Sequence, residues 1–167
     1  SCQIGIVPQE LNFDPFFTPK EILEVQAGLY GIKKEYRKTK EILEDLDLYN
    51  KANSYTRSLS GGMKRKLEII RGLIHGPKVL FLDEPTTGLD PESRRNLWEY
   101  LSDEQQKNGV TVFLTTHYLE EVDNADRICI IDRGRIVSLG TPEEVKSDLA
   151  GAYLIVDCDD RASLSRE

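Results

Sequence analysis

Cysteine, positive charge and long apolar runs are all scarce in this sequence, and each shortage argues against a class of protein. The three cysteines, Cys2, Cys129 and Cys158, are an odd number with no close pair, which argues against a disulfide framework and a zinc site. With 22 Lys+Arg against 29 Asp+Glu, the net charge is -7, which disfavours a nucleic-acid surface. The apolar runs, such as Val79–Leu82, fall far short of the about 20 residues that a membrane-spanning helix needs.

What remains is the composition of a single globular domain. The chain has 167 residues, of which 39% are hydrophobic and 31% charged, so it can bury a sizeable core. Its first residues, Ser1–Gly5, lack the basic patch and the apolar stretch of a secretion signal. We therefore expect a cytosolic location.

Strand-like and helix-like stretches alternate along most of the chain, which predicts an α/β fold with a mostly parallel sheet. The apolar run Val79–Leu82 predicts a strand that is buried on both faces, and Val110–Leu114 predicts a second strand. Between them, Asp90-Pro91 predicts the start of a helix and Asn108-Gly109 predicts its end.

Residues 19–75 depart from this alternation and are predicted to be all helical, as an insert in the α/β core. The capping box at Thr18–Glu21 marks the first helix of the insert. After His117 we expect a short acidic helix, two strands joined in a tight hairpin at Arg133-Gly134, and a last helix that starts at the capping box of Thr141. Tyr153–Val156 is predicted to add one more strand.

Three short motifs carry the chemistry, and each alone has an ordinary structural interpretation. Ser60-Gly61-Gly62 opens a helix and could bind a phosphate, or could be a plain loop. Asp83-Glu84 ends an apolar strand and could hold Mg²⁺ and orient a water, or could be a solvated acidic pair. His117 follows another strand and could contact a phosphate, or could be structural.

Together these motifs resemble the ATP-binding cassette (ABC) ATPases. The resemblance runs from about Ile4 to Leu149, and the short insert between Gln9 and Ser60 makes it closest to cassettes of multidrug and ABC-2-type exporters. The matching segments are the Q-loop Val7-Pro8-Gln9, the signature Leu59–Gly62, the Walker B strand Val79–Glu84, the D-loop Gly88-Leu89-Asp90 and the switch histidine His117. Met63 stands where the family most often has glutamine.

The resemblance implies two catalytic residues, two residues that bind the metal ion, and the cofactors ATP and Mg²⁺. Glu84 would be the base that polarises the attacking water. Asp83 and Gln9 would hold Mg²⁺, directly or through water. His117 would steady the γ-phosphate in the transition state.

The resemblance also implies a second copy of the cassette, because such cassettes close head to tail around two ATP molecules. Ser60, Gly61 and Gly62 would bind the γ-phosphate of the ATP that the opposite subunit holds. Asp90 would lie at the seam between the two subunits.

The implied fold is a truncated P-loop NTPase core with a mostly parallel sheet and an inserted helical subdomain. None of the 12 glycines is followed by lysine, so the phosphate loop G-x-x-x-x-G-K-[S/T] does not occur in these residues. The chain is therefore expected to be a C-terminal fragment of a cassette, with negligible ATPase activity by itself and a tendency to self-associate that light scattering would detect. Its expected divisions are core residues 1–15, a helical subdomain 16–75, core residues 76–151 and the start of an extension at 152–167.

The function implied is that of the ATP-hydrolysing subunit of an exporter. It would work with separate membrane-spanning subunits, at the inner face of the membrane, and without nucleic acid. One alternative is the cassette of a soluble machine of the translation type, and another is a non-catalytic interaction module that lacks nucleotide binding. DNA-repair cassettes are disfavoured, because they place long coiled coils between the Q-loop and the signature.

Overall fold

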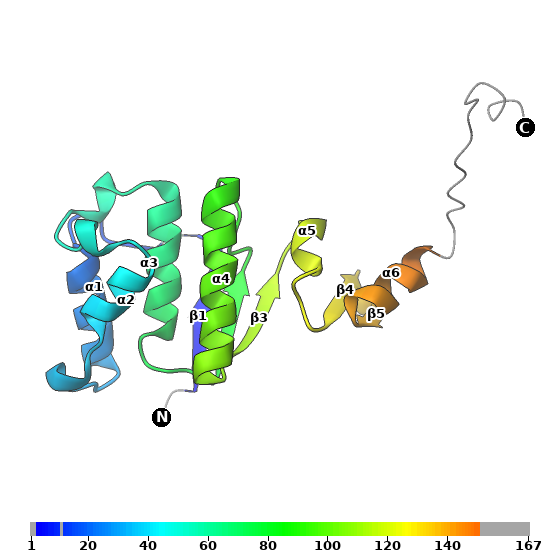
Figure 1. Ribbon diagram of the computed structural model, residues 1–167, viewed down its shortest axis with the longest axis horizontal. Helices are drawn as coiled ribbons and strands as arrows, with labels where there is room; N and C mark the ends of the chain where they lie inside the picture. The colour runs from blue at the N-terminus through cyan, green and yellow to red at the C-terminus, as the bar shows by residue number, and fades with distance from the viewer. Residues whose placement is uncertain (1–2, 11, 151–167) are drawn as a thin grey trace, which may run out of the picture. The chain divides into compact units, whose positions relative to one another are not determined.

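The computed structural model describes residues 3–10 and 12–150, and its helices and strands are drawn in Figure 1. The chain forms two compact units that divide between His117 and Tyr118, so the two are described separately below. This division falls inside the segment 76–151 that the sequence assigns to the core, and the boundaries at 15, 75 and 151 stay a prediction. The strand predicted at 153–156 lies outside the described residues.

The first unit is built on a three-stranded parallel sheet, as the alternation of strands and helices predicts. Its strands are β1 (Ile4–Val7), β2 (Val79–Asp83) and β3 (Thr111–Thr115), in the order β1-β2-β3. Val7 pairs with Leu82, and Asp83 pairs with Thr115. Because all three strands run in one direction, their carboxyl ends meet at the same edge of the sheet.

Only one face of this sheet is buried within the described residues, so the prediction that the strand at Val79–Leu82 is buried on both faces is wrong. Leu80 and Leu82 are buried, whereas Phe81 between them is 39% exposed. The cause is that the helices α3 (Gly61–Leu73) and α4 (Pro91–Asn108) both pack on the Leu80 side, and Figure 1 shows the two helices side by side.

The described residues between the first two strands form three α-helices and three short 3₁₀ turns. The bounds are α1 (Pro19–Leu29), η1 (Lys34–Tyr36), α2 (Thr39–Asp45), η2 (Tyr49–Lys51), η3 (Thr56–Ser58) and α3. The predicted capping box of α1 is confirmed, since Thr18 and Glu21 each accept a hydrogen bond from the other's backbone N–H. The segment is thus helical where the apolar spacing is regular, and turns fill the rest.

Helix α3 joins the helical segment to the sheet because it presents apolar side chains to both. Ile69 and Leu73 pack in the cluster that covers β1 and β2. Leu67 and Ile70 pack in a second cluster, formed with residues of α1 and α2 and with apolar residues that flank the turns η2 and η3. Helix α3 therefore buries side chains in both hydrophobic clusters. This packing fixes the position of the signature turn, at the N-terminus of α3, relative to the strand ends.

The described residues of the second unit, 118–150, form α5 (Leu119–Val122), the antiparallel strands β4 (Ile128–Asp132) and β5 (Arg135–Gly140), and α6 (Pro142–Ala150). The predicted tight hairpin is confirmed. Arg133 and Gly134 both have positive φ, at 48° and 76°, as the two central residues of a type I′ turn require. Within the described residues of the chain, no helix combines the length and the apolar character that crossing a bilayer requires.

Candidate functional site

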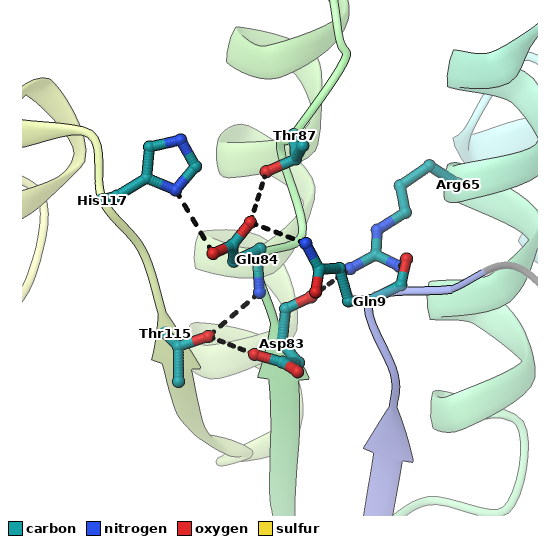
Figure 2. Close-up of polar contacts among 7 residues, drawn as sticks. All are labelled: Gln9, Arg65, Asp83, Glu84, Thr87, Thr115 and His117. Carbon is teal, nitrogen blue, oxygen red and sulfur yellow. Dashed lines mark hydrogen bonds and ion pairs between the residues drawn. The ribbon is translucent and has the colours of Figure 1, made fainter.

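The carboxyl edge of the parallel sheet brings together residues from three strand ends (Figure 2). Gln9 follows β1, Glu84 follows β2, and His117 follows β3 by two residues. Ligands of open parallel sheets bind beyond this edge. Three of the positions that the sequence analysis singles out, far apart in the chain, are therefore neighbours in the fold.

Glu84 is the centre of this cluster, because three side chains contact its carboxylate (Figure 2). Its Oε2 accepts hydrogen bonds from Gln9 Nε2 and Thr87 Oγ1, both at 3.0 Å. Its Oε1 lies 3.3 Å from His117 Nδ1. The Glu84 side chain keeps 28% of its surface exposed and the His117 side chain 55%, so the cluster is open to a ligand from solvent.

The backbone of Glu84 has a positive φ of 45°, which is uncommon for a residue with a Cβ. Such a conformation costs on the order of 1–3 kcal/mol and persists only where neighbouring contacts hold it. One of these contacts is the hydrogen bond that the Glu84 N–H donates to Thr115 Oγ1, at 3.1 Å. The turn directs the Glu84 side chain toward Gln9 and His117 and away from the line of β2.

Thr115 also holds Asp83, so one hydroxyl connects both acids of the pair. It donates a hydrogen bond to Asp83 Oδ1 at 2.5 Å and accepts the one from the Glu84 N–H. The neighbouring strand thus fixes the first acid through its side chain and the second through its backbone. Within residues 3–10 and 12–150, no three His, Cys, Asp or Glu side chains lie close enough to hold a metal ion by themselves.

The signature residues Ser60, Gly61 and Gly62 form the start of α3. Ser60 caps the helix, since its Oγ accepts a hydrogen bond from the Met63 N–H at 3.2 Å, as predicted. A Cβ placed on Gly61 would meet nothing within 4 Å, so the first turn is open to an approaching group. None of the three signature residues takes part in the hydrogen bonds around Glu84 that Figure 2 shows.

Asp90 caps α4 and has no place in the Glu84 cluster. Its carboxylate accepts hydrogen bonds from the Ser93 N–H at 2.9 Å and from Ser93 Oγ at 2.6 Å. These bonds lower the pKa of Asp90 below its usual value, with the hydroxyl bond as the largest cause. The described contacts thus give Asp90 a helix-capping role.

The family described as "ABC transporter" matches residues 1–87, which include Gln9, the signature turn and the acids Asp83 and Glu84 at the end of β2. The chain belongs to the ABC transporter family. His117 and Asp90 lie beyond the matched residues, so their assignment depends on the resemblance of the motifs alone.

Known relatives in the ABC transporter family include proteins named for export. The chain is 40% identical over 169 residues to "Nod factor export ATP-binding protein I" of Burkholderia lata, covering 99% of this chain and 55% of that protein. The protein of the same name from Ralstonia nicotianae is 42% identical over 156 residues, which cover 92% and 48%. The chain spans about half the length of these relatives.

Among solved structures, one described as "Structure of ATP binding subunit of ABC transporter" resembles the chain with a TM-score of 0.77. The match is 26% identical and covers 90% of this chain and 64% of that one. It supports a truncated P-loop NTPase fold, with parallel strands and packed helices as predicted from the ABC transporter motifs.

Sequence reasoning missed two residues near the Glu84 cluster. Thr115 follows the predicted strand Val110–Leu114 directly, and parallel pairing of that strand with Val79–Leu82 is the signal that could have placed it beside Asp83. Arg65 is a basic residue of α3, yet it is only 4% exposed and reaches the strand ends. No sequence pattern distinguishes this arginine from the basic residues on either side of it.

Proposed function

We propose that the full-length protein hydrolyses ATP with Glu84 as the general base. The observation that carries the proposal is the convergence of Gln9, Thr87 and His117 on the Glu84 carboxylate at the carboxyl edge of the sheet. Glu84 would take a proton from water while the water oxygen bonds to the γ-phosphorus and the bond to the leaving β-phosphate oxygen breaks. His117 would donate to a γ-phosphate oxygen.

Asp83 and Gln9 are proposed to hold the Mg²⁺ that accompanies ATP. The donor set fits, because Mg²⁺ prefers carboxylate and carbonyl oxygens and usually takes one or two from the protein while phosphates and waters supply the rest. Thr115 keeps the Asp83 carboxylate in place through Oδ1. A bound Mg²⁺ ion would neutralise charge on the β- and γ-phosphates.

The signature turn is proposed to bind the γ-phosphate of an ATP held by a second copy of the protein. Support comes from the backbone N–H groups at the start of the 13-residue helix α3 and from the open space at Gly61. Ser60 makes its hydrogen bonds within α3 and none with the Glu84 cluster, which is consistent with an action on another subunit. Asp90 would then lie at the seam between the two copies.

We further propose that the protein is the ATP-binding subunit of an exporter. The relatives in Burkholderia lata and Ralstonia nicotianae carry the name of Nod factor export ATP-binding proteins. In this proposal the protein couples ATP hydrolysis to transport by separate membrane-spanning subunits, and it lies at the cytoplasmic face of the membrane through them.

The test is the substitution Glu84→Gln in the full-length protein. Because a positioned base contributes about 10² to 10⁴ in rate, kcat should fall by at least about 10²-fold while ATP binding persists. The control is Glu99→Gln, which removes an exposed acid on α4. Turnover by Glu84→Gln equal to that of the control would refute Glu84 as the base.

A further inference from the structure

Arg65 is a buried cation whose side chain contacts main-chain oxygens from two separate loops. It lies in the second turn of α3 and is 4% exposed. Nε donates to Pro85 O at 2.9 Å, and Nη2 donates to Asp83 O at 2.7 Å. Nη1 donates to Pro8 O at 2.6 Å and more weakly to Gln9 O at 3.4 Å. Figure 2 shows the guanidinium beside the ends of β1 and β2.

Two of these carbonyls belong to the residues on either side of Glu84. Asp83 O belongs to the peptide group that precedes Glu84, and Pro85 O belongs to the peptide group that follows Pro85. Because the proline ring fixes φ at Pro85, holding these two carbonyls limits the turn between them and so restricts φ and ψ of Glu84. This matters because Glu84 has a φ of 45°, a conformation that needs support from its surroundings. Arg65 therefore acts on the direction of the Glu84 side chain without touching its carboxylate.

The other two carbonyls belong to the loop that carries Gln9. Gln9 Nε2 donates to Glu84 Oε2 at 3.0 Å, so the two loops also meet through their side chains. One planar guanidinium thus fixes the backbones of both partners in that hydrogen bond. A lysine has the charge but lacks the rigid fork of donors that reaches several carbonyls at once.

The charge of Arg65 is balanced inside the protein. Burial lowers the pKa of Arg65, and the negative charges of Glu68 and Asp83 oppose that effect. A buried cation is stable only when its donors are matched by acceptors. The hydrogen bonds to main-chain oxygens meet this requirement. They also connect Arg65 to the ends of β1 and β2.

We propose that Arg65 is a positioning residue of the ATPase site, which aims Glu84 and Gln9 at each other by fixing the carbonyls on both sides of Glu84 and in the Gln9 loop. The proposal rests on the proposed function for its effect on turnover. Its effect on the two loops does not depend on that function and is measured separately below.

The kinetic test compares Arg65→Lys with Arg95→Lys, the same change at an exposed arginine of α4, in the full-length protein. A displacement of about 1 Å in a catalytic group can cost about 10²-fold, so Arg65→Lys should lower kcat on the order of 10²-fold and leave the KM for ATP within about threefold. Arg95→Lys should leave both constants unchanged. A kcat for Arg65→Lys within about threefold of the unaltered protein would overturn the proposal.

A double-mutant cycle separates positioning from a general loss of structure. If Arg65 acts through Glu84, then Arg65→Lys should lower single-turnover hydrolysis by less than about threefold in a Glu84→Gln background. An equal loss in both backgrounds would show that Arg65 does not act through Glu84, and the proposal would be wrong.

Hydrogen exchange measures how firmly the Gln9 loop and residues 84–88 are held, and this measurement does not depend on ATP hydrolysis. Arg65→Lys should speed amide exchange at residues 84–88 and in the Gln9 loop by at least about tenfold, and leave residues 97–101 in the core of α4 unchanged. In the unaltered protein, the Nε–H of Arg65 should exchange at least about tenfold more slowly than the Nε–H of Arg95. This measurement does not require that any variant folds. Unchanged loop exchange, or equal Nε–H rates, would overturn the proposal. Turnover that does not depend on Glu84 would refute the proposed function, and these exchange rates alone would then decide whether Arg65 holds the loops.

Discussion

At the scale of single residues, the site depends on hydrogen bonds between residues at the ends of neighbouring strands. The sequence predicts Asp83, Glu84 and His117 as site residues, because two acids and a histidine that follow apolar strands can be recognised from the order of residues. It does not predict that Glu84 adopts a positive φ, since that conformation results from hydrogen bonds to residues distant in the chain. Nor does it predict the burial of Arg65, because a basic residue next to Lys64 and Lys66 is typical of a solvated helix face.

Thr115 gives a prediction at this scale. Thr115→Val keeps the shape of the side chain but removes the hydroxyl that joins Asp83 Oδ1 to the Glu84 N–H. Because both acids lose a positioning contact, kcat of the full-length protein should fall by about tenfold or more. Thr115→Ser, which keeps the hydroxyl, is the control and should stay within about threefold of the unaltered protein. Equal activity of the valine and serine variants in a steady-state assay would contradict this role.

At the scale of elements, the helices and strands follow the sequence closely, because caps and apolar spacing are local signals. Thr18 and Ser60 cap α1 and α3, and Asp90 caps α4, as predicted. The turns η1, η2 and η3 do not follow from the sequence, because η1 and η2 contain no buried residue and η3 only Thr56, so they leave no apolar spacing that predicts them. Close contact between α3 and β1 is likewise a tertiary property, made where Gly5 faces Gly72.

Gly5 gives a prediction about this contact. A Cβ on Gly5 would lie 2.4 Å from the main-chain oxygen of Gly72, which cannot move without shifting α3. Gly5→Ala should therefore lower the free energy of unfolding by about 1–3 kcal/mol, measured by denaturant titration. Gly28→Ala is the matched control: the position is exposed on α1 and its Cβ would be 3.4 Å from Arg37 Nη2, so stability should rise by about 0.4–1 kcal/mol. A neutral Gly5→Ala would show that α3 and β1 are not in close contact.

Glu24 gives a prediction about pH, because it joins α1 to α2. Its Oε2 accepts a hydrogen bond from Arg37 at 2.7 Å and its Oε1 accepts one from Thr39 at 2.8 Å. The bond from Arg37 is the largest cause that lowers the pKa of Glu24 below its usual 4.5. A lowered pKa means that the folded state favours the ionised form. The stabilisation is therefore present above about pH 4.5 and is lost as the pH falls through the folded-state pKa.

Glu24→Gln should accordingly lower the free energy of unfolding by about 1 kcal/mol at pH 7, a value reduced for partial solvent exposure. The difference from the unaltered protein should shrink toward zero as the pH falls below 4.5. Glu41→Gln is the control, since its side chain is exposed and lies 4.0 Å from Lys38. A difference that stays constant between pH 7 and pH 3 would contradict the assignment.

At the scale of the whole molecule, the α/β class and the parallel sheet are predicted from the alternation of strands and helices, but the burial of the sheet is not. Ile6, Phe81 and Phe113 lie in register on the face opposite α3 and α4 and are 69%, 39% and 57% exposed. An apolar run predicts burial on both faces, whereas the actual burial depends on which helices pack on each face. Periodicity within one strand does not contain that information.

In the proposed function, each ATP is bound between two copies of the protein, with Glu84 from one copy and Ser60 from the other. A measurement on mixed subunits tests this central claim most directly. Full-length Glu84→Gln and Ser60→Arg subunits should each be inactive alone, because every site in either dimer lacks one required group. Mixed in equal amounts and allowed to exchange, they should recover about a quarter of the unaltered activity, since half of the dimers then contain one intact site of two. A mixture of Glu84→Gln with the double variant Glu84→Gln/Ser60→Arg is the control and should stay inactive. No recovery in the first mixture, with subunit exchange verified, would show that Glu84 and Ser60 do not form one site across two copies.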